Sequence, residues 1–214
     1  MNHIRRLPTK DGPLIDAVVT EMELDYAEYW HKHYQPDIDS SNRADSGWSW
    51  PNLYKWFHPL AGALQQQPFS YCIGVEGAAG EFVPVGMLLV VGKYPYLFKH
   101  SLQSVFAWYL ASIPASLSKA RFGSNPPKAI GHALIDVMLT HSMLCGREGR
   151  SGLHASPLGG VELFDFYRKK VGMANLRPDR TLPRGRLFTG NDGHYFYSDE
   201  LIASQILTKQ TSYR

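Results

Sequence analysis

The stretch Val105-Phe-Ala-Trp-Tyr-Leu-Ala-Ser-Ile-Pro114 and the segments that follow it up to Met173 give the clearest indication of the fold. The run is apolar, rich in residues that favour strands, and closed by a proline, so it predicts a buried strand. A polar connection leads to residues 128–144, where apolar residues recur at helical spacing. A short strand at 151–156 and a second helix at 161–170 come next, and Gly172 ends that helix. This order predicts a βαβ unit with two neighbouring parallel strands and one further helix.

The remaining segments predict strands and helices around this unit. Residues 69–75 and 82–91 are expected to form a hairpin across a Gly-Ala-Ala-Gly turn, and a second hairpin is predicted at 186–190 and 194–197. Further expectations are a first strand at 2–7, helices at 13–33, 52–66 and 200–209, and a mobile polar loop at 35–49. We therefore expect a single domain of α/β (α+β) class over residues 1–214.

Composition and charge exclude several classes of protein. The net charge of +3 is small and the basic residues are spread along the chain, so no nucleic-acid partner is expected. No uninterrupted apolar run approaches the ~18 residues of a membrane span, so no membrane partner is expected either. Charged residues between positions 5 and 11 stand where a secretion signal needs an apolar core, which indicates a cytoplasmic protein. Cys72 and Cys145 form no C-x-x-C motif, and we predict two reduced thiols and no metal site.

The start of the helix at 128–144 has the features of a phosphate-binding site. The first N–H groups of a helix have no intrahelical partner and carry the positive end of the helix dipole. Small residues there let a pyrophosphate approach the main chain. Ala129, Gly131 and Ala133 are small, and Lys128 adds a cation. The alternative is an ordinary helix start, in which Gly131 only allows close packing.

Three stretches resemble the GCN5-related N-acetyltransferase (GNAT) superfamily, in that family's order. Leu110-Ala-Ser-Ile-Pro114 resembles the end of the family's cofactor strand, and Lys128-Ala-Ile-Gly-His-Ala133 resembles the end of its acyl-CoA loop. Leu163-Phe-Asp-Phe-Tyr-Arg-Lys-Lys-Val-Gly-Met173 resembles the helix that closes the site. A fourth stretch, Ile4-Arg-Arg-Leu-Pro-Thr-Lys-Asp11, adds to these three and is similar to the family's opening strand and its entry into a first helix. The resemblance implies a mixed, mostly antiparallel sheet flanked by helices, with a parallel strand pair at a cofactor cleft.

The resemblance also implies a function. Members of the family transfer an acetyl group from acetyl-CoA to a primary amine by direct attack of the amine on the thioester. The acceptor expected here is therefore a small-molecule or peptide amine, and a homodimer is compatible with the family. The cofactor-binding residues implied by position are Ser112, Ile113, Lys128, Ala129, Ile130, Gly131, His132 and Ala133.

Catalytic roles follow from the same resemblance. The main-chain N–H groups of Ser112 and Ile113 are the candidates to stabilise the oxyanion, and Tyr167 aligns with the family's proton donor to the departing thiolate. The cofactor strand at 105–113 contains no carboxylate to act as a general base. His154, on the following strand, is the alternative base, with Glu76 or Glu81 as others.

Departures from the family pattern keep other interpretations open. Pro126 stands where the family has Arg or Gln and cannot donate an N–H group, and Ala129 replaces the first glycine. The connection from Pro114 to Gly131 is also longer than the family's; Lys119, Arg121 or Lys128 could compensate through charge. A binding or regulatory module on the same fold is the second hypothesis, and an unrelated α/β protein is the third. The acceptor pocket is expected near Trp48–Trp56 and in the loop at 174–186.

Overall fold

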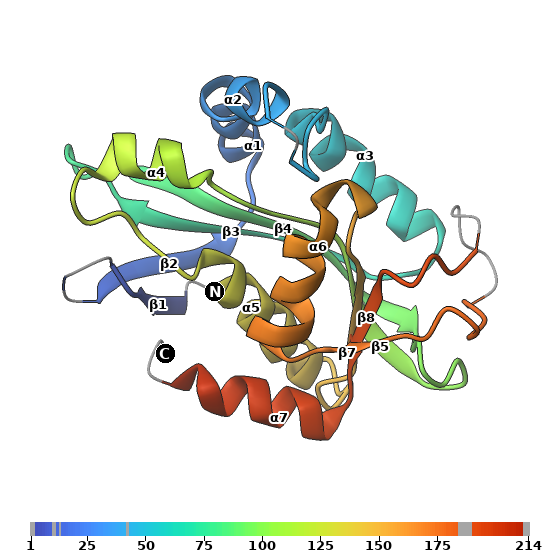
Figure 1. Cartoon of the computed structure of the whole chain (residues 1–214). Helices are drawn as coiled ribbons and strands as arrows, with labels where there is room; N and C mark the ends of the chain where they lie inside the picture. Colours follow the sequence, from blue (N-terminus) through green and yellow to red (C-terminus); the bar gives the residue numbers. More distant parts are fainter. Residues whose placement is uncertain (1–2, 10–11, 13, 42, 184–189, 212–214) are drawn as a thin grey trace.

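A mixed eight-stranded sheet lies at the centre of the molecule, with helices on both of its faces (Figure 1). The computed structural model describes residues 3–9, 12, 14–41, 43–183 and 190–211. The strand order is β1-β2-β3-β4-β5-β6-β8-β7. The strands are β1 His3–Leu7, β2 Ile15–Glu21, β3 Pro68–Glu76, β4 Phe82–Pro95, β5 Gln103–Ser112, β6 Ser151–His154, β7 Ala174–Asn175 and β8 Tyr195–Ser198.

Neighbouring strands are antiparallel except for β5 and β6, which are parallel, as the βαβ pattern predicts. This parallel pairing runs only from Val105 opposite Ser151 to Ala107 opposite Leu153. β5 then continues to Ser112, still paired to β4, while β6 ends at His154. The two strands therefore splay apart beyond Ala107 and leave an opening in the sheet.

Helices cover both faces of the sheet, and one further helix lies in the connection that follows β5. They are α1 Leu24–His33, α2 Gln35–Asp39, α3 Trp50–Ala63, α4 Ala115–Phe122, α5 Ile130–Leu144, α6 Gly160–Asp165 and α7 Glu200–Lys209, with a π-helical turn at Phe166–Val171 directly after α6. The helices predicted at 52–66, 128–144, 161–170 and 200–209 are confirmed within a few residues. In the part of the chain that the structure describes, no helix has the length and apolar character needed to cross a membrane.

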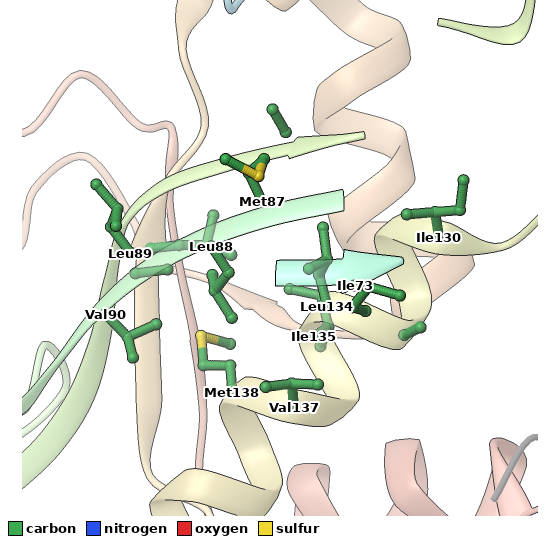
Figure 2. Packing of buried hydrophobic residues seen from close by; sticks show 14 of the residues in the cluster. Ile73, Met87, Leu88, Leu89, Val90, Ile130, Leu134, Ile135, Val137 and Met138 are labelled. Carbon is green, nitrogen blue, oxygen red and sulfur yellow. The ribbon is translucent and has the colours of Figure 1, made fainter. Parts of the chain in front are cut away.

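The central helix α5 packs against β4 through large aliphatic side chains. Figure 2 shows Leu88 and Val90 pointing from β4 toward Leu134 and Met138 of α5. All four side chains are fully buried. The close approach also depends on Gly86 of β4, because a Cβ atom there would lie only 2.8 Å from the Cγ2 atom of Ile130. This packing fixes the N-terminus of α5 next to the opening between β5 and β6.

The prediction of one helix over residues 13–33 is wrong. Residues 15–21 form β2, which pairs with β1 and β3, and only Leu24–His33 is helical. Ala17 and Val19 are buried while their neighbours are partly exposed, which is the alternation of a strand. The stretch Val18-Val19-Thr20 is β-branched and favours that conformation. The likeness of residues 4–11 to a strand that enters a helix is therefore also wrong beyond Leu7.

Three further expectations need correction or lie outside the described residues. Residues 35–49 are not a mobile loop, because α2 occupies part of them and Asp39 accepts hydrogen bonds from Gln35 (2.7 Å) and from the Gly47 N–H (2.7 Å). The long connection before α5 holds the additional helix α4. Residues 186–189 of the strand predicted at 186–190 lie outside the described residues, whereas Tyr195–Ser198 forms β8 and pairs with β6 and β7.

Candidate active site

A cavity of about 1060 Å³ occupies the opening between β5 and β6. It is bordered by residues 106–112 of β5, the N-terminus of α5, the end of β6, the α6 region, the segment that connects α2 to α3, and the end of α3. The cavity therefore reaches both faces of the sheet. The predicted site residues Ser112, Ile113, Lys128, Ala129, Ile130, Gly131, His132, His154 and Tyr167 all line it, whereas Ala133 is buried behind the helix start.

The main chain of β5 presents unpaired donors to this cavity. In an antiparallel pair the N–H groups of successive residues point alternately toward and away from the partner strand. The Ile113 N–H donates to the Val85 carbonyl at 2.9 Å, so it serves the sheet and is not available as an oxyanion donor. Ser112 and Leu110, opposite Gly86 and Leu88, then direct their N–H groups away from β4 and toward the gap. The sequence alone did not identify Leu110 as a candidate, because the direction of its N–H group is fixed only by the register of β5 with β4.

The N-terminus of α5 has the geometry of an anion site. Ala129 precedes the helix in the left-handed conformation (φ 57°, ψ 22°), and its carbonyl accepts the Ala133 N–H at 3.0 Å. The N–H groups of Ile130, Gly131 and His132 belong to the first turn, which has no intrahelical acceptor for them. These residues line the cavity together with Lys128 and Lys170. Neither Lys119 nor Arg121 lines it, and Arg121 forms an ion pair with Glu81 at 3.0 Å.

Gly131 and His132 also pack against the π-helical turn. A Cβ atom on Gly131 would lie 2.9 Å from the Cζ atom of Phe166, so this glycine allows α5 and Phe166 to approach each other. The His132 ring meets Phe166 edge-on at 5.0 Å. Burial lowers the pKa of His132, which favours the neutral imidazole. Gly131 therefore allows close packing against Phe166 and not against the sheet, while its N–H group still belongs to the first turn of α5.

Tyr167 projects from the π-helical turn into the cavity. Turns of this kind recur at functional sites because one extra residue re-aims the neighbouring side chains. The residue is only 5% exposed. Burial raises the pKa of its phenol, and the nearby carboxylate of Asp45 raises it further. Tyr167 therefore keeps its proton over the physiological range and has the protonation state of a proton donor.

Arg43 and Asp45 form an ion pair at the edge of the cavity that the sequence did not reveal. Two nitrogens of Arg43 donate to the two carboxylate oxygens of Asp45, each at 2.8 Å. The same guanidinium donates to the Ser112 carbonyl at 2.9 Å. Asp45 is 4% exposed. An Arg-x-Asp spacing in a polar segment carries no recognisable signal, and these contacts depend on tertiary folding.

The candidates for a general base fall in different places. His154 lines the cavity, donates from Nε2 to the Asp192 carboxylate at 2.8 Å, and stacks on Tyr195 at 4.4 Å. Glu76 and Glu81 lie at the β3–β4 turn and do not line the cavity. The carboxylates among the described lining residues are Asp45 and Glu162.

The cavity continues on the α3 face of the sheet. Trp48 lines it and meets Tyr109 edge-on at 4.9 Å, whereas Trp50 is fully buried against Trp30. The described residues 174–183 do not line it. The remaining lining side chains on this face are apolar or uncharged: Leu60, Leu64, Gln66, Tyr94, Phe106 and Trp108.

A second cluster of titratable groups lies at the other end of α5. The Cys145 Sγ atom is 3.2 Å from His141 Nε2, and His141 Nδ1 is 2.7 Å from the Tyr71 hydroxyl. Burial raises the pKa of the Cys145 thiol and lowers the pKa of His141 to about 4. The thiol is therefore protonated and the imidazole neutral, which is the state of a buried hydrogen-bonded cluster and not of an activated nucleophile.

No protein-family model matches the chain, and no curated protein matches it in sequence. The structure is similar to an acetyltransferase of the GNAT family from Staphylococcus aureus Mu50, with a TM-score of 0.53 and 11% identity over 86% of this chain and 99% of that one. It is also similar to a mutant of the AtaT toxin bound to acetyl-CoA and the C-terminus of the antitoxin AtaR, with a TM-score of 0.48 and 15% identity over 90% and 98%. The first likeness, the parallel β5–β6 pair and the splay between them confirm the predicted fold, so the chain has the fold of the GNAT superfamily.

Proposed function

We propose that this protein is an acetyl-CoA-dependent N-acetyltransferase that acts on a primary amine. The observation that carries the proposal is that the N-terminus of α5 and the β5 N–H groups that point away from β4 border the same cavity. A solved structure of the same fold is that of an acetyltransferase, and three of the stretches that resemble the family, at 110–114, 128–133 and 163–173, contribute residues to this cavity.

The residues at the α5 end fit the nucleotide part of acetyl-CoA. Three free N–H groups, the positive end of the helix dipole, and the side chains of Lys128 and Lys170 provide positive charge for a pyrophosphate. The small side chain of Ala129 lets phosphate oxygens approach the main chain at the start of α5. Pro126 removes one N–H group, and Lys128 at the rim of the cavity is the cation that compensates for it.

Acetyl-CoA supplies an activated acyl group, and the residues of β5 hold and polarise it. The N–H group of Ser112 donates to the thioester oxygen as negative charge develops there. The N–H group of Leu110 lies two residues back along the strand, about 6.6 Å away, and serves another acceptor of the bound acetyl-CoA. The amine nitrogen forms the bond to the carbonyl carbon, the carbon–sulfur bond breaks, and the proton of Tyr167 passes to the departing sulfur. The apolar surroundings on the α3 face lower the pKa of the bound ammonium, which yields the neutral nucleophile, and His154 is the candidate to accept its proton.

Release of the coenzyme A thiol in the presence of acetyl-CoA and a panel of primary amines tests this function. We expect release that depends on both the amine and the enzyme. A protein that binds acetyl-CoA but transfers the acetyl group to none of the amines would favour the alternative, a binding or regulatory module on the same fold.

A further inference from the structure

We propose that the acceptor is a primary amine carried on an elongated, uncharged, apolar body, which occupies the α3 side of the cavity. We call this part the apolar half and define it as Leu60, Leu64, Tyr94, Phe106 and Trp108. The assignment rests on the proposed acetyl transfer at the opening between β5 and β6, and it adds the chemical class of the acceptor.

The apolar half is a continuous surface of aromatic and aliphatic side chains. Trp108 meets Phe57 of α3 edge-on at 5.7 Å, and Tyr94 packs on Phe106 at 4.5 Å. Leu60 and Leu64 border it from the end of α3. From Leu110 to Phe106 is four strand positions, or about 13 Å at the rise of a strand. The body of the acceptor therefore extends about this far from the reacting nitrogen.

The charged side chains that line the cavity all lie outside the apolar half. Lys128, Lys170 and Glu162 lie at the α5 and α6 side, and Arg43 and Asp45 neutralise each other. Among the described residues of the apolar half there is no carboxylate. A second ammonium group placed along the apolar half, short of its solvent-exposed end, would lose its hydration without gaining a counter-charge. The site therefore selects against polyamines.

The apolar half is open to solvent at its far end. Leu60 is 40% exposed and Leu64 is 45% exposed. An acceptor can enter there and reach the reacting carbon from the face opposite to the α5 N-terminus.

Gln66 provides a polar group at the far end. It lines the cavity, and its Oε1 atom is buried without a hydrogen-bond partner. A buried carbonyl without a donor is unfavourable. Rotation of the amide toward a hydroxyl on the tail of the acceptor would satisfy it.

A series of linear amines with acetyl-CoA tests the length and charge of the acceptor. We expect kcat/KM to rise roughly threefold per methylene from butylamine through hexylamine to octylamine, because each methylene is removed from water. We expect 1,8-diaminooctane to fall at least tenfold below octylamine, and 8-amino-1-octanol to lie between them or above octylamine. A flat series, a preference for the diamine, or faster turnover of octanoyl-CoA than of acetyl-CoA would overturn the inference.

A charge placed at the open end provides a matched test. Leu64→Glu adds a carboxylate at an exposed position of the apolar half, so we expect the kcat/KM ratio of 1,8-diaminooctane to octylamine to increase about tenfold. Leu201→Glu, at a position of α7 that is 67% exposed and outside the cavity, is the control and should leave the ratio unchanged. An equal response of the two variants would contradict the assignment.

Tryptophan fluorescence separates this inference from the proposed function, since Trp48 and Trp108 line the cavity. Without acetyl-CoA, octylamine should change the emission at lower concentration than 1,8-diaminooctane does. This result in a protein that fails to bind acetyl-CoA would support the apolar half while removing the transferase. Equal titration curves for the two amines would overturn the apolar half, whether or not acetyl-CoA binds.

Discussion

The guanidinium of Arg43 donates to the main-chain carbonyl of Ser112 at 2.9 Å, although 69 positions separate the two residues. The contact ties the segment between α2 and α3 to the free end of β5. Arg43 also donates to both carboxylate oxygens of Asp45. One side chain therefore links the segment between α2 and α3 to the end of β5, and both of these border the cavity. The position of the Ser112 N–H, on which the proposed polarisation of the thioester depends, is set from outside the sheet.

Arg43→Ala should lower both the stability and the turnover. It leaves the buried Asp45 carboxylate without its partner, which we expect to cost about 2 kcal/mol in the free energy of unfolding. Urea unfolding measures this loss. Arg43→Lys keeps the charge but cannot contact both partners with a planar fork, so it should recover stability more than kcat. Full recovery of kcat by lysine would contradict a positioning role.

Tyr167→Phe should lower kcat at least tenfold while the affinity for acetyl-CoA changes less than twofold. The hydroxyl is needed only as the thiolate leaves, so its removal acts on the transition state and not on binding. Steady-state kinetics, with calorimetric titration of acetyl-CoA, separates the two effects. Parallel losses in affinity and turnover would assign Tyr167 to packing.

Ala129→Gly should stabilise the protein by about 0.5–1 kcal/mol, measured by urea unfolding. Ala129 has a φ of 57°, and the left-handed conformation is strained for a residue with a Cβ atom and unstrained for glycine. Ala129→Val places a branched side chain in the same conformation and should destabilise. A lower stability of the glycine variant would show that the left-handed conformation of Ala129 is not strained.

The stability should decrease in acid because of His141. Burial lowers the pKa of this histidine to about 4, against about 6.5 in the unfolded chain. Between these pH values the unfolded chain binds a proton that the folded chain does not, so the free energy of unfolding falls as pH drops from about 6.5 to about 4. We expect a loss on the order of 2 kcal/mol.

Urea unfolding at pH 7, 6, 5 and 4 measures this profile. His141→Leu should flatten it, whereas replacement of His31, which is exposed on α1, should not. An unchanged slope in His141→Leu would show that other groups cause the loss.

Local patterns in the sequence predicted the part of the fold that surrounds the opening. The strand ended by Pro114, the helix at Ile130 and the closing segment with Tyr167 each depend on short-range spacing, and their order fixes the parallel pair. Residues 15–21 were assigned to a helix because their apolar residues also fit helical spacing. They form a strand because they pair with β1 on one side and with β3 on the other, and these contacts across the fold are not visible in the local pattern.

The candidate site was predictable only where it depends on one segment. Lys128 to His132 and Tyr167 line the cavity as the motifs indicate. Arg43, Asp45 and Leu110 could not be identified, because their roles depend on contacts across the fold and on the register of β5 with β4. The Ile113 N–H was proposed as an oxyanion donor from its position in the sequence alone. The same register directs it to the Val85 carbonyl, to which it donates a hydrogen bond.

The pyrophosphate site at the N-terminus of α5 can be tested by calorimetric titration of the purified protein with acetyl-CoA, coenzyme A and desulfo-CoA. We expect micromolar affinity for all three, because they share the pyrophosphate that this helix end binds, and an affinity about tenfold weaker in Lys128→Met. Absence of binding at sub-millimolar concentration would contradict the pyrophosphate site, and with it the proposed transferase.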